Sequence, residues 1–310
     1  MDCPSIEEVG TPWDSTIGNW WLIPAFVEYG TLIRQAYGAW LSFKGFFVNI
    51  RVLGAHGSDL LLSGPTGPHI CRSVGFLVNE ELMVDAGTLA SGLTLDEQKR
   101  ITHILLSHLH LDHVKGIPPL VDNMTGRVDH QIVVASLPSV LVGLQQHVFN
   151  DLVFPNFFHL PKSQYVMLRG EKLEPKQECR LPGRLRVTPI PVNHTVETTG
   201  FIIQDDEVAW IYSGDTYVTD NLWQEAARIP NLKGVFIEVS FPDSMKDMAS
   251  RSKHLTPTLL AQEYRKIGKP DLPLYVYHMK PTVRDQIIDD ISHLDIPHVT
   301  ILKEGQELKF

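Results

Sequence analysis

From residue 46 onward, short apolar stretches of strand length alternate with segments that carry helix start and stop signals. The run 101–106 is mainly apolar, and the stretches 73–78 and 82–85 flank a turn and predict a hairpin. The other predicted strands are 46–53, 132–135, 185–191, 200–204, 208–212, 235–239, 274–277 and 299–302. The predicted helices are 139–149, 220–228, 256–267 and 282–293, with a short helix ending at 96–100 and another starting at Pro118-Pro119. Strands and hairpins mixed with helices predict an α/β sandwich with mixed sheets.

Two segments depart from this alternation. The segment 150–184 is rich in proline and charge, and we expect it to form mainly loops. Residues 1–45 are rich in aromatic side chains, but Pro24, Glu28 and Arg34 interrupt the apolar run. Because a spanning helix needs about 20 consecutive apolar residues, we do not expect stable membrane insertion. We expect 1–45 to be a hydrophobic arm that packs on the single domain 46–310, or on a second copy in a homodimer. Contact with a membrane surface is the alternative for this arm.

The composition narrows the class of protein. The 310 residues include 27 Lys and Arg and 36 Asp and Glu, which gives a formal charge of −9. Because phosphate contacts need a basic face, we do not expect a nucleic-acid partner. Cys3, Cys71 and Cys179 lie far apart with no C-x-x-C pair, so we expect a reducing, cytoplasmic location. The 14 histidines are unusual, and their positions are more informative than their number.

Three histidines and an aspartate lie close together directly after the predicted strand 101–106. The segment is Ser107-His108-Leu109-His110-Leu111-Asp112-His113. A loop at the end of a strand can direct alternate side chains to one spot, and imidazole and carboxylate groups are ligands for zinc, manganese or iron. We therefore expect His108 and His110 to reach one ion, and Asp112 and His113 to reach a second. An accidental cluster in a polar loop is the alternative, which the H-x-H-x-D-H spacing disfavours.

This motif resembles the metal-binding loop of the metallo-β-lactamase superfamily, and later segments match the rest of that pattern. The matching residues are His194 after the strand 185–191, Asp215 after 208–212 and His278 after 274–277. The resemblance covers residues from about 46 to 305. It implies an αββα sandwich in which two mixed β-sheets are flanked by helices.

The resemblance also implies two divalent metal ions, with zinc expected first and manganese or iron as alternatives. The ligands implied for metal 1 are His108, His110, His194 and Asp215. The ligands implied for metal 2 are Asp112, His113, Asp215 and His278. One aspartate then bridges both ions, and a water between them is acidified to a nucleophile at neutral pH.

Two further segments narrow the resemblance to class II 3′,5′-cyclic-nucleotide phosphodiesterases. These segments are Ile237-Glu238-Val239-Ser240-Phe241-Pro242 and His254-Leu255-Thr256-Pro257, with Met279-Lys280-Pro281 after the last ligand. In phosphodiesterase branches of the superfamily, a histidine at the place of His254 protonates the leaving alcohol, and a glutamate at the place of Glu238 orients it. The pKa of histidine suits this task. The predicted catalytic residues are therefore His254, Glu238 and Asp112, and the alternative for the first two is a surface histidine beside a solvated glutamate.

We expect three more residues to contribute to this site. Asp85, in Leu82-Met83-Val84-Asp85-Ala86-Gly87-Thr88, is expected to hold a metal-binding histidine through a hydrogen bond. The first loop is Gly54-Ala55-His56-Gly57-Ser58, where the family often has adjacent glycines. We expect His56 to touch the phosphate or the base of the substrate, and Lys280 to offset phosphate charge. For both, the alternative is a side chain that is only exposed to solvent.

The resemblance implies a metal-dependent hydrolase that opens cyclic nucleotides, cAMP or cGMP, to 5′-monophosphates. A tRNA 3′-processing endonuclease of the same superfamily shares these residues but needs a basic, usually glycine-rich, RNA-gripping arm. The segment 150–184 contains basic residues, but also acidic ones and no glycine-rich run. A lactonase or arylsulfatase remains an alternative, because loops rather than the fold determine the substrate. A non-catalytic binding protein is disfavoured, because all seven expected ligands are present.

Overall fold

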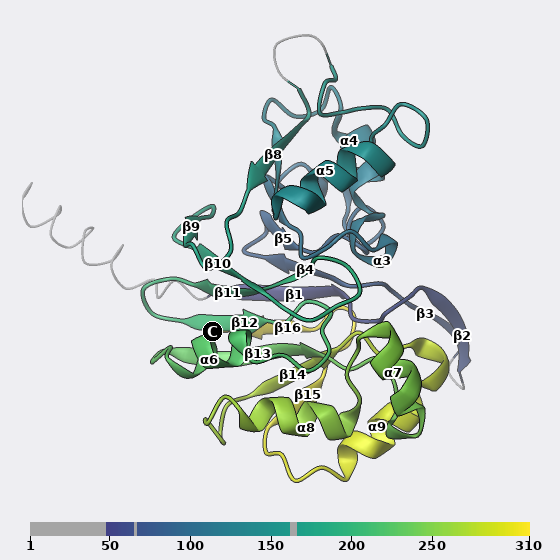
Figure 1. The fold of residues 1–310 in the computed structure, drawn as a ribbon. Helices are drawn as coiled ribbons and strands as arrows, with labels where there is room; N and C mark the ends of the chain where they lie inside the picture. Colours follow the sequence, from purple (N-terminus) through teal and green to yellow (C-terminus); the bar gives the residue numbers. More distant parts are fainter. Residues whose placement is uncertain (1–47, 65–66, 162–165) are drawn as a thin grey trace, which may run out of the picture. The chain divides into compact units, whose positions relative to one another are not determined.

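The computed structural model describes residues 48–64, 67–161 and 166–310. Among these residues, two seven-stranded mixed sheets pack face to face (Figure 1). Sheet 1 runs in the order β16 (Glu307–Lys309), β1 (Asn49–Gly54), β4 (Gly75–Val78), β5 (Leu82–Val84), β6 (His103–Leu105), β7 (Ile132–Ser136) and β8 (Leu168–Lys172). Sheet 2 runs in the order β15 (Val299–Ile301), β14 (Leu274–Tyr277), β13 (Leu232–Glu238), β12 (Ala209–Tyr212), β11 (Thr199–Gln204), β10 (Arg186–Pro191) and β9 (Cys179–Arg180). A separate two-stranded sheet pairs β2 (Leu60–Gly64) with β3 (Gly67–Cys71).

Helices cover the outer face of each sheet (Figure 1). Those on the side of sheet 1 are α2 (Leu95–Gln98), α3 (Leu111–Val114), α4 (Ile117–Met124) and α5 (Pro138–His147). Those on the side of sheet 2 are α6 (Asn221–Ala227), α7 (Lys246–Ser252), α8 (Pro257–Arg265) and α9 (Arg284–Ser292). The 3₁₀ turns Asp243–Met245 and Pro281–Val283 lead into α7 and α9. This arrangement confirms the predicted αββα sandwich.

The apolar core has three layers because the central strands are buried on both faces. In β13, Phe236 faces the cluster between the two sheets, whereas Val235 and Ile237 face the cluster under the helices of sheet 2. Alternate residues of a strand point to opposite faces, so a strand buried on both faces has a continuous apolar run. This is why the runs 101–106 and 235–239 were recognisable as strands in the sequence.

The structure differs from the predicted elements mainly at sheet edges. The segment 150–184 is not all loop, because β8 pairs in parallel with β7 and β9 pairs with β10. The hairpin β2–β3, helix α7 and strand β16 were also not predicted. In β8, three of the five residues are charged and three are exposed, so an edge strand of this kind lacks an apolar signal.

The N-terminal arm predicted for residues 1–45 lies outside the described residues, and so it stays a prediction, as does the domain boundary next to it. No helix of the described part of the chain is long and apolar enough to cross a membrane.

Candidate metal centre

The predicted site residues follow strands whose carboxyl ends meet at one edge of the sandwich. Strands β5 and β6 are parallel, and so are β12, β13 and β14. Strand β10 has the same direction as β12, because each is antiparallel to β11. The loops after these strands therefore converge from both sheets. The sequence predicted the residues, and the parallel order of the strands brings them together.

Asp215 lies at the centre of this convergence and is 1% exposed. Its Oδ2 atom is near the Nε2 atoms of four histidines: His278 at 3.2 Å, His113 at 3.4 Å, His108 at 3.7 Å and His194 at 3.9 Å. The remaining two side chains lie against the same histidines. His110 Nδ1 is 3.2 Å from His194 Nε2, and Asp112 Oδ2 is 3.4 Å from His278 Nε2.

Hydrogen bonds to the Nδ1 atoms fix the orientations of four of the histidine rings. His113 Nδ1 is 2.7 Å from Asp85 Oδ2, and His278 Nδ1 is 2.8 Å from Ser240 Oγ. His108 Nδ1 is 2.9 Å from Ser107 Oγ, and His194 Nδ1 is 3.0 Å from the Lys253 carbonyl oxygen. In each of these four rings the outer nitrogen has a partner, so the Nε2 atom is directed at Asp215. Such partners set the tautomer and the orientation of metal-binding histidines.

The donor set fits two divalent cations. One group of possible ligand atoms comes from His108, His110, His194 and Asp215, and a second comes from Asp112, His113 and His278. Within the described residues, the buried atoms His108 Nε2 and Asp215 Oδ1 have no hydrogen-bond partner. Buried polar atoms without partners are rare in folded proteins and need an explanation such as an ion. A carboxylate and imidazoles at this spacing suit zinc, manganese or iron.

The charges inside the cluster are mutually dependent. Burial lowers the pKa of His108 well below its usual value, with His113 adding to the effect. Burial alone would lower the pKa of His113 as well, but Asp215 and Asp85 raise it well above the usual range. Burial alone would raise the pKa of Asp112, but the His278 and His113 rings hold it below its usual value. These shifts favour a neutral imidazole at His108 and an ionised carboxylate at Asp112, the forms in which both groups ligate metals, whereas the carboxylates around His113 favour its protonated form.

Asp85 makes the predicted hydrogen bond to a histidine of the cluster, His113, and we call a residue with this role an anchor. Asp85 also has further partners. Its carboxylate accepts hydrogen bonds from the Ser107 backbone N–H at 2.8 Å and from the Tyr212 hydroxyl at 2.5 Å. The residue is fully buried and has a φ of 53°, a backbone conformation that costs a non-glycine residue about 1 kcal/mol or more. Two residues later, a Cβ at Gly87 would lie 1.8 Å from the Asp112 carbonyl oxygen, so only glycine fits under the metal-binding loop.

His254 and Glu238 form a pair beside the two groups. His254 Nδ1 is 2.8 Å from Glu238 Oε1, and both residues are buried. Ser240 Oγ donates to Glu238 Oε2 at 2.9 Å and also contacts His278, so the pair is tied to the metal-binding cluster. Burial alone would lower the pKa of His254, but the Glu238 carboxylate raises it above the usual value. The Glu238 carboxylate thus favours the protonated form of His254, whose ring has a nitrogen within 4.8 Å of ligand atoms of Asp215 and His278.

His56 and Lys280 lie on the Asp112 side, with different surroundings. Lys280 Nζ donates to the Gly57 carbonyl oxygen at 2.7 Å and is 3.9 Å from Asp112 Oδ2. The His56 ring is buried, and its Nδ1 atom is 2.7 Å from Glu304 Oε1. The structure thus shows His56 in contact with the loop before β16, and its contact with substrate stays a prediction.

Comparison with known families identifies the fold around this cluster. A model of the beta-lactamase superfamily domain matches residues 82–279. The chain belongs to this superfamily. The matched residues begin at β5 and end just after His278, and so they include every predicted metal ligand, Asp85, Glu238 and His254.

In sequence, the chain is similar to proteins named as 3′,5′-cyclic-nucleotide phosphodiesterases. It is 28% identical over 264 residues to a 3′,5′-cyclic-nucleotide phosphodiesterase of Aliivibrio fischeri, covering 68% of this chain and 77% of that protein. It is 28% identical over 242 residues to the 3′,5′-cyclic-nucleotide phosphodiesterase 1 of Saccharomyces cerevisiae, covering 66% of this chain and 60% of that protein.

Solved structures show the same fold. The crystal structure of unliganded yeast PDE1 superposes with a TM-score of 0.68 at 23% identity, covering 85% of this chain and 99% of that chain. The metallo-beta-lactamase fold protein YhfI of Bacillus subtilis superposes with a TM-score of 0.66 at 17% identity, covering 85% and 99%.

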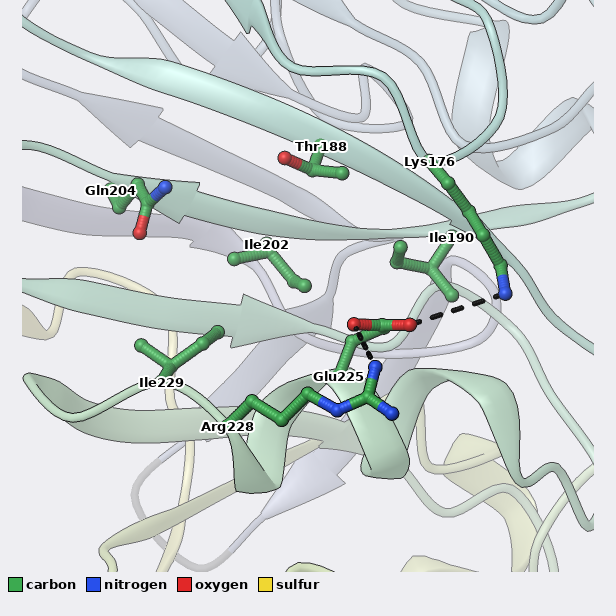
Figure 2. Close-up of a pocket in the computed structure, with 8 residues that line it drawn as sticks. All are labelled: Lys176, Thr188, Ile190, Ile202, Gln204, Glu225, Arg228 and Ile229. Atoms are coloured by element: carbon green, nitrogen blue, oxygen red, sulfur yellow. Dashed lines mark hydrogen bonds and ion pairs between the residues drawn. The ribbon is translucent and has the colours of Figure 1, made fainter.

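A hollow on the outer face of sheet 2 shares no residue with the metal-binding cluster. It has a volume of about 250 Å³ and lies where β10 and β11 meet α6 (Figure 2). Its floor contains Ile190, Ile202 and Ile229. Figure 2 shows that Lys176 and Arg228 both point to Glu225, with separations of 4.0 and 2.9 Å. Because these charges pair with one another, they do not define a ligand site.

Four residues of the site were given no role in the sequence analysis. Ser107, Ser240, Tyr212 and the Lys253 carbonyl each hold a predicted ligand or the supporting residue Asp85. Ser240 lies within the Glu-Val-Ser segment, so a signal was present without an assigned role. Lys253 has a φ of 59°, which turns its carbonyl toward His194, and nothing in its sequence context indicates this.

Proposed function

We propose that this chain is a metal-dependent phosphodiesterase that hydrolyses 3′,5′-cyclic nucleotides, cAMP or cGMP, to 5′-monophosphates. The observation that carries the proposal is the hydrogen-bonded pair His254–Glu238 next to two ligand groups that meet at Asp215. The ligand groups suit a hydrolase in general, and the pair adds the proton donor that an alkoxide leaving group needs. The names of the relatives in Aliivibrio fischeri and Saccharomyces cerevisiae support the same substrate class.

In this proposal the two groups hold one divalent ion each, most readily zinc. His108, His110 and His194 would hold the first ion, Asp112, His113 and His278 the second, and Asp215 both. Such a pair of ions acidifies a water and neutralises charge on phosphoryl oxygens. The anchors Asp85, Ser107, Ser240 and the Lys253 carbonyl keep the ligand nitrogens in place, so that little reorganisation is needed during the reaction.

The residues of the chain then control the leaving group. In the hydrolysis, the oxygen of water forms a new bond to phosphorus while the bond between phosphorus and the 3′-oxygen breaks, and His254 Nε2 would donate its proton to the departing 3′-oxygen. Glu238 accepts the hydrogen bond from His254 Nδ1, which orients the ring and favours its protonated form before the reaction. Lys280, held by the Gly57 carbonyl near Asp112, adds positive charge for the phosphate.

The test is turnover of 3′,5′-cyclic AMP by the purified protein, with and without a chelator. We expect the cyclic nucleotide to disappear only without the chelator, and the matched variant Asp215→Asn to be inactive. Turnover that survives the chelator would contradict the proposal. So would no turnover by protein that carries about two ions per chain, and cleavage of a precursor tRNA by that protein would point to an endonuclease instead.

A further inference from the structure

Phe241 is the one aromatic side chain outside the histidine cluster that contacts His254 in the described part of the chain. Three rings lie against His254: those of His194 at 5.0 Å, His278 at 5.2 Å and Phe241 at 5.9 Å between centroids. The first two belong to the ligand groups. Phe241 follows β13 three residues after Glu238, so the same strand end positions both the partner of His254 and this phenylalanine.

The Phe241 ring is not part of the apolar core. It is partly exposed and belongs to none of the three hydrophobic clusters found in the described residues. Tyr217, another partly exposed ring near this end of the site, differs because Lys253 Nζ already lies over it, 5.1 Å from the centroid. An apolar ring that core packing does not explain, next to a proton donor, is suited to contact a ligand.

The two sides of the site differ in polarity. On the Asp112 side, Lys280 lies near the carboxylate and provides charge. On the His254 side, Phe241 provides an apolar face. In a cyclic nucleotide the base is attached to the same ribose as the leaving 3′-oxygen. A substrate whose leaving oxygen is at His254 therefore has its base within one ribose of this residue, and among the described residues Phe241 is the aromatic ring outside the ligand groups that contacts His254.

We propose that Phe241 forms a subsite for the planar ring of the substrate and determines specificity by stacking. This inference rests on the proposed function, because it takes His254 as the group that meets the leaving oxygen. The chemistry recognised is a flat aromatic ring attached to a phosphodiester. It can come from a purine base or from an aryl ester, and the experiment separates the two.

The test compares the wild type with Phe241→Leu and Phe241→Trp on three substrates. These are 3′,5′-cyclic AMP, the 3′,5′-cyclic phosphate of 1-deoxyribose, which has no base, and bis(4-nitrophenyl) phosphate. Loss of a base–aromatic stack raises the KM for cyclic AMP roughly tenfold in Phe241→Leu, with kcat little changed. We expect Phe241→Trp to retain the wild-type KM, and the baseless substrate to show the same KM in all three proteins.

Phe310→Leu is the matched control. Phe310 is also partly exposed, but it stacks on Trp210 near the start of β12, whereas Asp215 follows the end of that strand. This variant should leave every KM unchanged. If Phe241→Leu raises the KM for the nitrophenyl ester alone, the subsite binds aryl esters, and the proposal that it binds the base of a nucleotide is wrong.

Two results overturn the subsite altogether. One is an equal effect of Phe241→Leu on cyclic AMP and on the baseless substrate, because Phe241 would then act only by supporting His254. The other is no effect on any substrate. Failure of the proposed function is distinguishable, since in that case the wild type itself would turn over neither cyclic substrate.

Discussion

At the scale of residues, the candidate site depends on which nitrogen of each imidazole is held. Asp85, Ser107, Ser240 and the Lys253 carbonyl each occupy the outer nitrogen of one ring. The sequence was sufficient to predict which seven side chains come together around Asp215, because four of them lie in one short motif. It was not sufficient for most of the anchors. Ser240 is 38 residues from His278 and Lys253 is 59 residues from His194, so only the fold brings them together.

His254 is the residue whose role separates proton donation from metal binding. Its side chain also lies in a group with Asp215 and His278 that has the spacing of a metal site. We expect His254→Ala to reduce kcat by about 10²- to 10⁴-fold, because a general acid is lost, and to keep the metal content of the wild type. The measurements are steady-state kinetics and metal analysis of the purified variants.

The matched control for this prediction is His194→Ala, which removes a proposed ligand from the same cluster. This variant should lose metal as well as turnover. If His254→Ala instead loses about one ion per chain, then His254 is a ligand and the proposed acid is wrong.

At the scale of elements, short helices are linked to the sheets by individual side chains, and helix α2 is an example. Helix α2 begins with a capping box in which Thr94 and Glu97 satisfy each other's backbone N–H groups. Glu97 Oε1 also accepts from Arg51 of β1 at 2.7 Å, so this short helix is tied to sheet 1. The Thr94 backbone N–H and the Arg51 side chain lower the pKa of Glu97 to about 2.

Glu97→Gln should therefore destabilise the protein in a pH-dependent way. The pKa of Glu97 is lower in the folded state than its ordinary value of 4.5, so its charge stabilises the fold above pH 4.5. This contribution disappears as the pH falls from 4.5 towards 2. We expect a loss of about 1 kcal/mol at pH 7, measured by urea unfolding, because the group is near the surface.

The control for this measurement is Glu207→Gln, at an exposed turn between β11 and β12. It should change the free energy of unfolding little at any pH. An equal loss for Glu97→Gln at pH 7 and at pH 3 would show that packing, not charge, explains the effect.

At the scale of the whole molecule, the predicted sandwich is confirmed where strands are buried and incomplete where they are exposed. Strands β6, β7, β12 and β13 have apolar runs because sheets and helices cover both faces. Strand β8, with the sequence LRGEK, and β16, with ELK, lie at sheet edges and have mostly polar residues, so pairing defines them and sequence pattern does not. The site was more predictable than the edges, since its chemistry requires particular residue types at strand ends.

The identity of the product tests the central claim most directly. Purified protein carrying its metal ions is incubated with 3′,5′-cyclic AMP, and the product is identified by chromatography against 5′-AMP and 3′-AMP. Because His254 protonates the 3′-oxygen in our account, we predict 5′-AMP alone. Formation of 3′-AMP would show that the 5′-oxygen leaves, and it would contradict the orientation of the substrate on which both proposals rest.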